Sequence, residues 1–82
     1  MQYQVLIVDD SKLARMVMTS ALRRLRPEWP IVEAGNADDA IGALAKHEVD
    51  IALIDFNMPG MDGLELVASI RKTHPNLSLI HI

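Results

Sequence analysis

Two short apolar runs that each end abruptly in aspartate constrain the fold of this chain more than any other feature. The first, Tyr3–Val8, ends at Asp9 and Asp10. The second, Ile51–Ile54, ends at Asp55. A short apolar run bounded by turn residues is typical of a strand buried on both faces. If the two strands are parallel neighbours, their carboxylates converge at the sheet edge where open α/β sheets place ligand sites.

Three carboxylates brought this close repel one another, so the site requires protons or a cation. A hard divalent ion with oxygen ligands, above all Mg²⁺, suits carboxylates together with a backbone carbonyl. Taken alone, Asp55 is also explained as a residue that opens a turn. A calcium loop starting at Asp55 does not fit, because Pro59 occupies a ligand position and Leu66 stands where the closing glutamate is needed.

Helical periodicity separates the strands. Ser11 is a good N-cap, and the apolar spacing after it predicts a first helix that runs to the Arg-rich segment before Pro27. The expected buried stripe of this helix consists of Leu13, Val17, Ala21 and Leu25, widened by Ala14, Met18 and Leu22. Trp29 is expected to cover the end of this helix.

The remaining elements repeat the alternation. Ile31–Ala34 is a short strand, and Asn36 caps a second helix whose inner face is expected to hold Ala40, Ile41 and Leu44. Val49–Ile54 is the third strand. A third helix follows from Leu64 to near Pro75, and Leu77–Ile82 is a fourth strand. The order β-α-β-α-β-α-β predicts a parallel sheet with right-handed crossovers.

Composition narrows the functional classes. A chain of 82 residues is expected to form a single domain, residues 1–82. Its net charge of −3 argues against direct nucleic-acid binding, and the lack of cysteine excludes disulfides and thiolate metal sites. No apolar segment is long enough to span a bilayer, and no signal peptide is visible, so we expect a cytoplasmic protein.

Two motifs together resemble a known family. Asp9-Asp10-Ser11 and the segment from Asp55 to Gly63, DFNMPGMDG, are similar to the receiver (CheY-like) domain of bacterial two-component response regulators. The resemblance implies a flavodoxin-like α/β fold with strand order 2-1-3-4 in this chain. It also implies a C-terminal truncation, because the last helix, strand and helix of the receiver fold would follow Ile82.

The resemblance implies a role for each matching residue. Asp55 corresponds to the acceptor of a phosphoryl group from a sensor histidine kinase or a histidine phosphotransfer protein. The Mg²⁺ ligands correspond to Asp9, Asp10, Asp55 and the backbone carbonyl of Asn57, and Gly63 corresponds to the turn into the third helix. The partner is expected at the edge of the first helix, formed by Ser11, Ala14 and Arg15.

A second function remains open. Receivers place a Ser or Thr directly after the fourth strand and a Lys at the end of the fifth, so the phosphorylation switch is expected to be incomplete here. The alternative is a truncated, self-associating interaction module with a vestigial metal pocket. An exposed fourth strand predicts a homodimer through Leu77, Leu79, Ile80 and Ile82. We expect no enzymatic activity beyond self-catalysed phosphotransfer and dephosphorylation. A small Mg²⁺-dependent phosphatase is disfavoured because it would need a general acid that is not evident.

Overall fold

The computed structural model describes residues 2–55 and 63–81, and strands alternate with helices along them. The elements are β1 (Val5–Val8), α1 (Lys12–Leu25), β2 (Ile31–Ala34), α2 (Ala37–Lys46), β3 (Ile51–Ile54), α3 (Gly63–Thr73) and β4 (Ser78–His81). The predicted order is confirmed. Three strands are shorter than expected: the apolar runs begin at Tyr3, Val49 and Leu77, but strand pairing begins only at Val5, Ile51 and Ser78.

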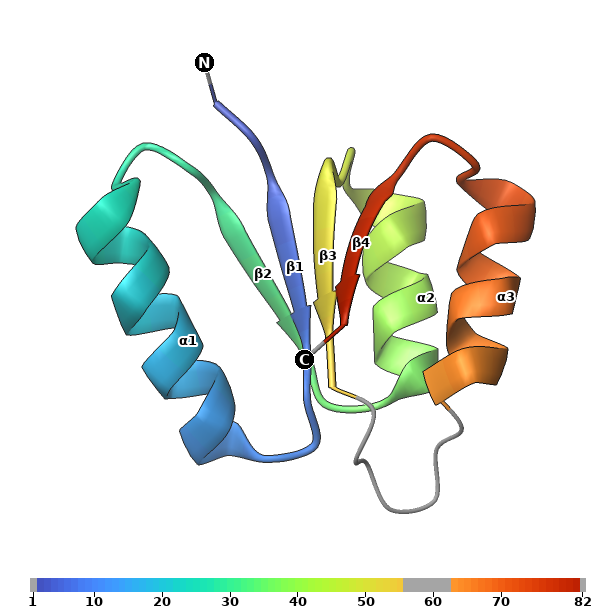
Figure 1. Cartoon of the computed structure of the whole chain (residues 1–82), viewed down its shortest axis with the longest axis horizontal. Helices are drawn as coiled ribbons and strands as arrows, with labels where there is room; N and C mark the ends of the chain where they lie inside the picture. Colours follow the sequence, from blue (N-terminus) through green and yellow to red (C-terminus); the bar gives the residue numbers. More distant parts are fainter. Residues whose placement is uncertain (1, 56–62, 82) are drawn as a thin grey trace.

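All four strands are parallel, and the sheet order is β2-β1-β3-β4. Helix α1 covers one face of the sheet, whereas α2 and α3 cover the other (Figure 1). This division follows from right-handed crossovers, because the chain moves from β1 to β2 in one direction and then from β2 to β3 and β4 in the opposite one. The reversal lies between β1 and β3, where an open sheet leaves a crevice beyond the carboxyl ends of its strands.

The strand that is buried on both faces is β1, whose four residues are all buried. We expected this of Ile51–Ile54, but β3 alternates: Ala52 and Ile54 are buried, whereas Ile51 and Leu53 are half-buried. The first two pack in the main core between the sheet and the α2–α3 layer. Both strands lie between two others, so the difference arises on the α1 side of the sheet, where α1 packs against β1 and leaves β3 partly uncovered.

The predicted buried face of α1 is partly wrong. Leu13, Val17 and Leu25 are 71%, 62% and 68% exposed. The helix instead turns Thr19 towards the sheet, with Ala14, Arg15, Met18 and Leu22 half-buried. Apolar residues occupy more than one face of this helix, so periodicity alone could not indicate which face meets the sheet. The exposed apolar side of α1 has no covering element among the described residues.

Thr19 is the polar residue that α1 buries, with 7% of its surface exposed. Among the described residues its hydroxyl has no hydrogen-bond partner. We expect Thr19→Val to raise the free energy of unfolding by about 1 kcal/mol, because a buried unpaired hydroxyl costs about 1–3 kcal/mol and valine has nearly the same shape. Urea denaturation measures the difference. Thr73→Val is the control, since the Thr73 hydroxyl lies 3.4 Å from the Ile70 carbonyl and has a partner to lose. A loss of stability in Thr19→Val would contradict this assignment.

Two further expectations about buried residues need correction. In α2, Ala40 and Leu44 are buried as predicted, but Ile41 is 49% exposed because it lies about 100° around the helix from Ala40. At the other end, Leu77 is only 6% exposed and belongs to the main core. Its side chain is therefore not part of an exposed strand edge, unlike Ile80, which is 50% exposed.

The amino ends of the strands hold a small aromatic cluster. The rings of Tyr3 and Trp29 pack edge to face with centroids 5.1 Å apart, and the Arg26 guanidinium lies 5.7 Å from the Trp29 ring centroid. Arg26 follows α1 directly, so Trp29 covers the helix end as expected. In the described ranges no helix has both the length and the apolar character needed to cross a membrane.

Candidate functional site

The register of the sheet brings the predicted acidic residues level with one another. Val8 of β1 pairs with Ile54 of β3, so Asp9 and Asp55 both follow the last paired residues of adjacent strands. The Asp55 amide donates to the Val8 carbonyl at 3.0 Å, which extends the ladder into the site. The site thus lies at the carboxyl ends of β1 and β3, where the strand connections diverge.

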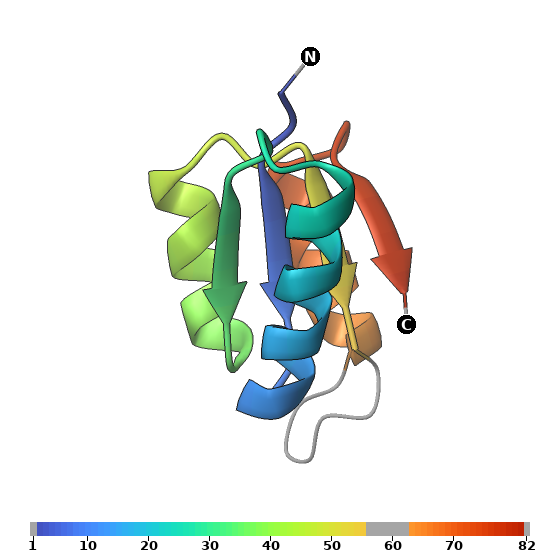
Figure 2. The ribbon, with the colours of Figure 1, turned by 90° about the vertical axis from the view of Figure 1, so that its left-hand side faces the viewer.

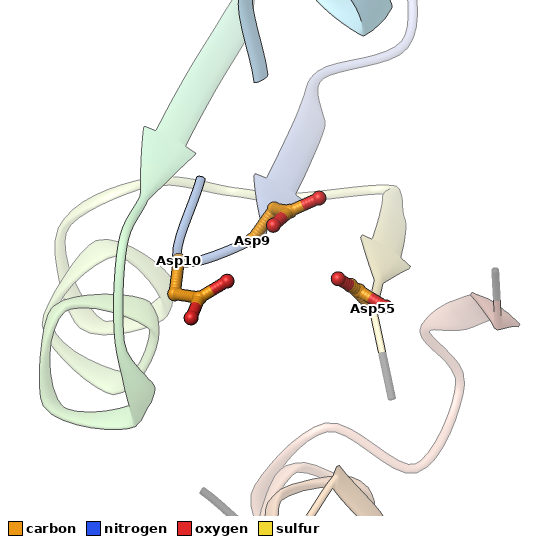
Figure 3. Close-up of side chains that lie close together, drawn as sticks. All are labelled: Asp9, Asp10 and Asp55. Atoms are coloured by element: carbon orange, nitrogen blue, oxygen red, sulfur yellow. The ribbon is translucent and has the colours of Figure 1, made fainter. Parts of the chain in front are cut away.

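Three carboxylates meet at this place. Asp9, Asp10 and Asp55 each offer one oxygen, and these oxygens all lie within 4.8 Å of one another. Figure 3 shows the first two side chains extending from the end of β1 and the third from the end of β3, around a common space. Asp9 is buried, Asp55 is half-buried and Asp10 is exposed. The site therefore has a buried base and an open side through which a ligand can enter.

Asp9 is held by the backbone around it. Its amide donates to the Ala34 carbonyl of β2 at 3.1 Å. Its Oδ1 accepts the Ser11 amide at 3.0 Å, which closes a tight turn just before α1. The Ser11 hydroxyl in turn accepts the Ala14 amide at 3.2 Å, so the predicted N-cap of α1 is confirmed. Together these bonds tie the acidic turn to both β2 and α1.

Arg15 adds a contact that sequence reasoning missed. Its Nη1 donates to the Asp9 carbonyl, and its Nε lies 3.1 Å from Oε1 of Glu33 in β2. Gly35, just after β2, leaves room for this guanidinium, because a Cβ there would lie 3.2 Å from Arg15 Nη1. One signal was available: Glu33 is a charged residue inside the otherwise apolar strand Ile31–Ala34.

Two of the remaining predicted site residues lie beside the acidic cluster. Ser11 is exposed and Ala14 is half-buried at the start of α1, beside the acidic residues. Asn57 lies outside the described residues, as does Ile82.

An open hollow of about 580 Å³ connects Asp9 and Asp55 with the exposed Leu13 and Val17 of α1. A second hollow, between α2 and α3, is lined by apolar residues such as Ile41 and contains no carboxylate.

The three carboxylates fit a small divalent cation. Oxygens bound to one Mg²⁺ lie about 3–4 Å apart, given metal–oxygen distances of about 2.1 Å. A spread of up to 4.8 Å is slightly wider, which leaves room for water molecules that Mg²⁺ usually retains. Without a cation, three carboxylates at this spacing repel one another. The donor set is all oxygen, as Mg²⁺ prefers.

Comparison with known proteins finds related sequences and structures. Residues 5–82 match the sequence profile of the family described as "Response regulator receiver domain". The cyclic di-GMP phosphodiesterase response regulator RpfG of Xanthomonas campestris pv. campestris (strain 8004) is 34% identical over 80 residues, which are 95% of this chain and 21% of that protein. The DNA-binding transcriptional regulator NtrC of Salmonella typhimurium (strain LT2) is 40% identical over 76 residues, which are 93% of this chain and 16% of that protein.

A solved structure shows the same fold. The response regulator TrrA from Thermotoga maritima, in complex with Mg²⁺-BeF, superposes with a TM-score of 0.85 at 27% identity, over 94% of this chain and 65% of that one. The chain thus spans between 16% and 21% of the length of the two relatives above. The activities for which those longer proteins are named are therefore not carried over to this chain.

Proposed function

This chain belongs to the response regulator receiver family, and we propose that Asp55 is the residue on which it accepts a phosphoryl group. Receivers are the phosphoacceptor domains of two-component signal transduction. The observation that carries the assignment is that three aspartates directly after β1 and β3 each place one carboxylate oxygen within 4.8 Å of the others. Among them, Asp55 comes from the other strand and faces the Asp9–Asp10 pair (Figure 3).

The chemistry asked of Asp55 is a nucleophilic substitution at phosphorus. One of its carboxylate oxygens forms a bond to phosphorus, while the bond to the donor histidine nitrogen breaks and the nitrogen keeps the electron pair. The products are an acyl phosphate on Asp55 and a neutral imidazole on the donor, because the donor ring reacts with its other nitrogen protonated. Such a transfer depends on in-line positioning and on neutralising the charge of the equatorial oxygens. The ladder bond from the Asp55 amide to Val8 fixes the position of the acceptor.

The need to neutralise the charge on the phosphoryl oxygens gives Asp9 and Asp10 their role as metal ligands. We propose that Asp9, Asp10, Asp55 and the Asn57 carbonyl hold Mg²⁺, of which Asn57 lies outside the described residues. When bound, Mg²⁺ offsets the charge on the phosphoryl oxygens, so an anion can attack an anion. The buried Asp9 holds one side of the pocket, and the exposed Asp10 leaves the other side open to water.

A small phosphodonor tests the assignment without a kinase. The chain is incubated with acetyl phosphate and Mg²⁺, and the modified residue is located by mass spectrometry after borohydride reduction of the acyl phosphate. We expect modification of Asp55. The interaction-module alternative, in which nothing is phosphorylated, predicts no labelling; the family match does not favour it.

Partners and location follow as proposals from the family. We propose that the donor is a sensor histidine kinase or a histidine phosphotransfer protein that docks at Ser11, Ala14 and Arg15. The exposed Leu13 beside them supports this, because apolar surface next to a reactive site suits a partner. The net charge of −3 supports the absence of direct nucleic-acid binding. Such donors draw on ATP, so we place the chain in the bacterial cytoplasm, as a phosphoacceptor and not as an enzyme that turns over a substrate.

We further propose a homodimer of this 82-residue chain through β4. Among the described residues β4 pairs only with β3, and it lies at the edge of the sheet (Figure 2). Ile80 there is 50% exposed, Leu79 is half-buried, and Ile82 lies outside the described residues. An exposed apolar edge is a template for strand pairing, and two copies can satisfy each other in one two-fold interface.

Light scattering after size-exclusion chromatography tests this prediction by measuring the molar mass of the protein in solution. We expect a dimer at micromolar concentration for the wild type and a shift to monomer for Ile80→Lys, since a charge at the strand edge opposes pairing. Ile41→Lys is the matched control, because Ile41 is 49% exposed but lies on α2, away from the edge. A well-folded wild-type monomer would contradict the proposed dimer.

A further inference from the structure

Arg15 stands out among the charged residues because its basic side chain is held against the proposed cation site. Its side chain is only 17% exposed. Its Nη1 donates to the backbone carbonyl of Asp9, and its Nε pairs with Glu33 at 3.1 Å. Gly35 keeps the space beside the guanidinium open. A guanidinium can make both contacts at once because its donors form a rigid, planar fork.

We propose that Arg15 is a positioning residue that fixes the Asp9–Asp10 turn for cation binding, with Glu33 neutralising its charge and Gly35 making room for it. The contact links the acidic turn after β1 to β2 through a side chain of α1. The Asp9 amide already bonds to Ala34 on the same side, so the Arg15 bond secures the carbonyl of the same residue. The inference rests on the proposed Mg²⁺ site and adds residues that do not bind the ion.

Electrostatics and positioning predict opposite results for Arg15→Ala. If Arg15 acted only through its charge, removing a cation near the pocket would strengthen Mg²⁺ binding. If it positions the turn, its removal weakens Mg²⁺ binding, because the carboxylates must then be ordered when the ion binds. The loss of a residue that orients metal ligands costs about 10–100-fold in metal affinity. The direction of the change therefore separates the two effects.

The experiment is a Mg²⁺ titration of the full chain and its variants followed by backbone amide NMR shifts. We expect Arg15→Ala to bind Mg²⁺ about 10-fold more weakly than the wild type. Arg15→Lys keeps the charge but has one nitrogen for two contacts, so we expect an intermediate loss. Gly35→Ala changes no charge but places a Cβ 3.2 Å from Arg15 Nη1, so we also expect weaker binding. Arg23→Ala, which removes the same charge from the far end of α1, should leave the affinity unchanged.

A second readout needs no metal. The Ser11 amide donates to Asp9 Oδ1 at 3.0 Å, so a looser turn exposes it to faster hydrogen exchange. We expect Arg15→Lys to accelerate exchange at Ser11 and to leave the Asp55 amide, which bonds to Val8 in the strand ladder, unchanged.

Mg²⁺ binding to Arg15→Ala that is equal to or tighter than that of the wild type would overturn the inference, as would unchanged Ser11 exchange in Arg15→Lys. A wild-type chain that fails to bind Mg²⁺ would instead contradict the proposed function. In that case the exchange of Ser11 would still decide whether Arg15 fixes the turn.

Discussion

Asp55→Asn will reduce phosphoryl labelling by acetyl phosphate to background. The amide has the size and shape of the carboxylate, but it lacks the anionic oxygen that attacks phosphorus. The backbone bond from residue 55 to Val8 survives the change, so the fold around the acceptor is retained. Intact-mass spectrometry of the chain, with and without Mg²⁺, measures the fraction labelled. Of all single substitutions in this chain, we expect this one to have the largest effect on function.

The same strand supplies the control for this prediction. Asp50 lies just before β3, at the end opposite Asp55, and its Oδ2 accepts the Gln4 amide at 2.8 Å. Asp50→Asn keeps an oxygen for that bond, so we expect normal labelling. Labelling that persists in Asp55→Asn would mean that another carboxylate, such as the exposed Asp10, is the acceptor.

Asp10→Ala will weaken Mg²⁺ binding by more than about 10-fold. Losing a charged ligand lowers Mg²⁺ affinity more than losing a residue that only orients a ligand, such as Arg15. It will also make the chain more stable than the wild type without metal and less stable than the wild type with Mg²⁺. Without metal, removing one of three clustered carboxylates relieves repulsion and raises the melting temperature. With Mg²⁺, the wild type gains stability from binding and the variant gains little, so their order reverses.

Thermal unfolding in EDTA and in excess Mg²⁺ measures this reversal. Glu48→Gln is the control, because Glu48 is exposed and lies before β3, at the end of the sheet away from the site. It removes the same charge and should shift both curves alike. Mg²⁺ affinity is measured by NMR and not by Trp29 fluorescence, because Trp29 packs on Tyr3 at the amino ends of the strands, far from the carboxylates. An Asp10→Ala chain that keeps wild-type Mg²⁺ affinity would remove Asp10 from the site.

The sequence predicted the features that depend on local pattern. The strand order and the convergence of Asp9, Asp10 and Asp55 followed from two apolar runs ending in acid and from the family resemblance. The caps at Ser11 and Asn36 followed from side-chain chemistry: Asn36 Oδ1 accepts the Asp39 amide at 2.8 Å. The caps depend only on neighbouring residues, so a single sequence suffices for them, whereas the strand order also needed the family resemblance.

Features that depend on packing between distant elements were not predictable in the same way. Leu13 and Val17 repeat at helical spacing, yet the sheet meets the side of α1 that carries Thr19. The bridge from Arg15 to Glu33 joins residues 18 positions apart. Neither residue shows its partner in the sequence, because the register that brings Glu33 opposite Ile7 comes from pairing between strands.

Binding of beryllofluoride, an analogue of the phosphoryl group, tests the central claim most directly. Its complex requires both the acceptor carboxylate and the metal, so ¹⁹F NMR of the chain with beryllofluoride reports on the whole site. We predict a bound signal that appears only with Mg²⁺, disappears in Asp55→Asn and remains in Asp50→Asn. A folded wild-type chain that shows no Mg²⁺-dependent signal, or a signal that survives in Asp55→Asn, would contradict the assignment of Asp55 as the phosphoacceptor.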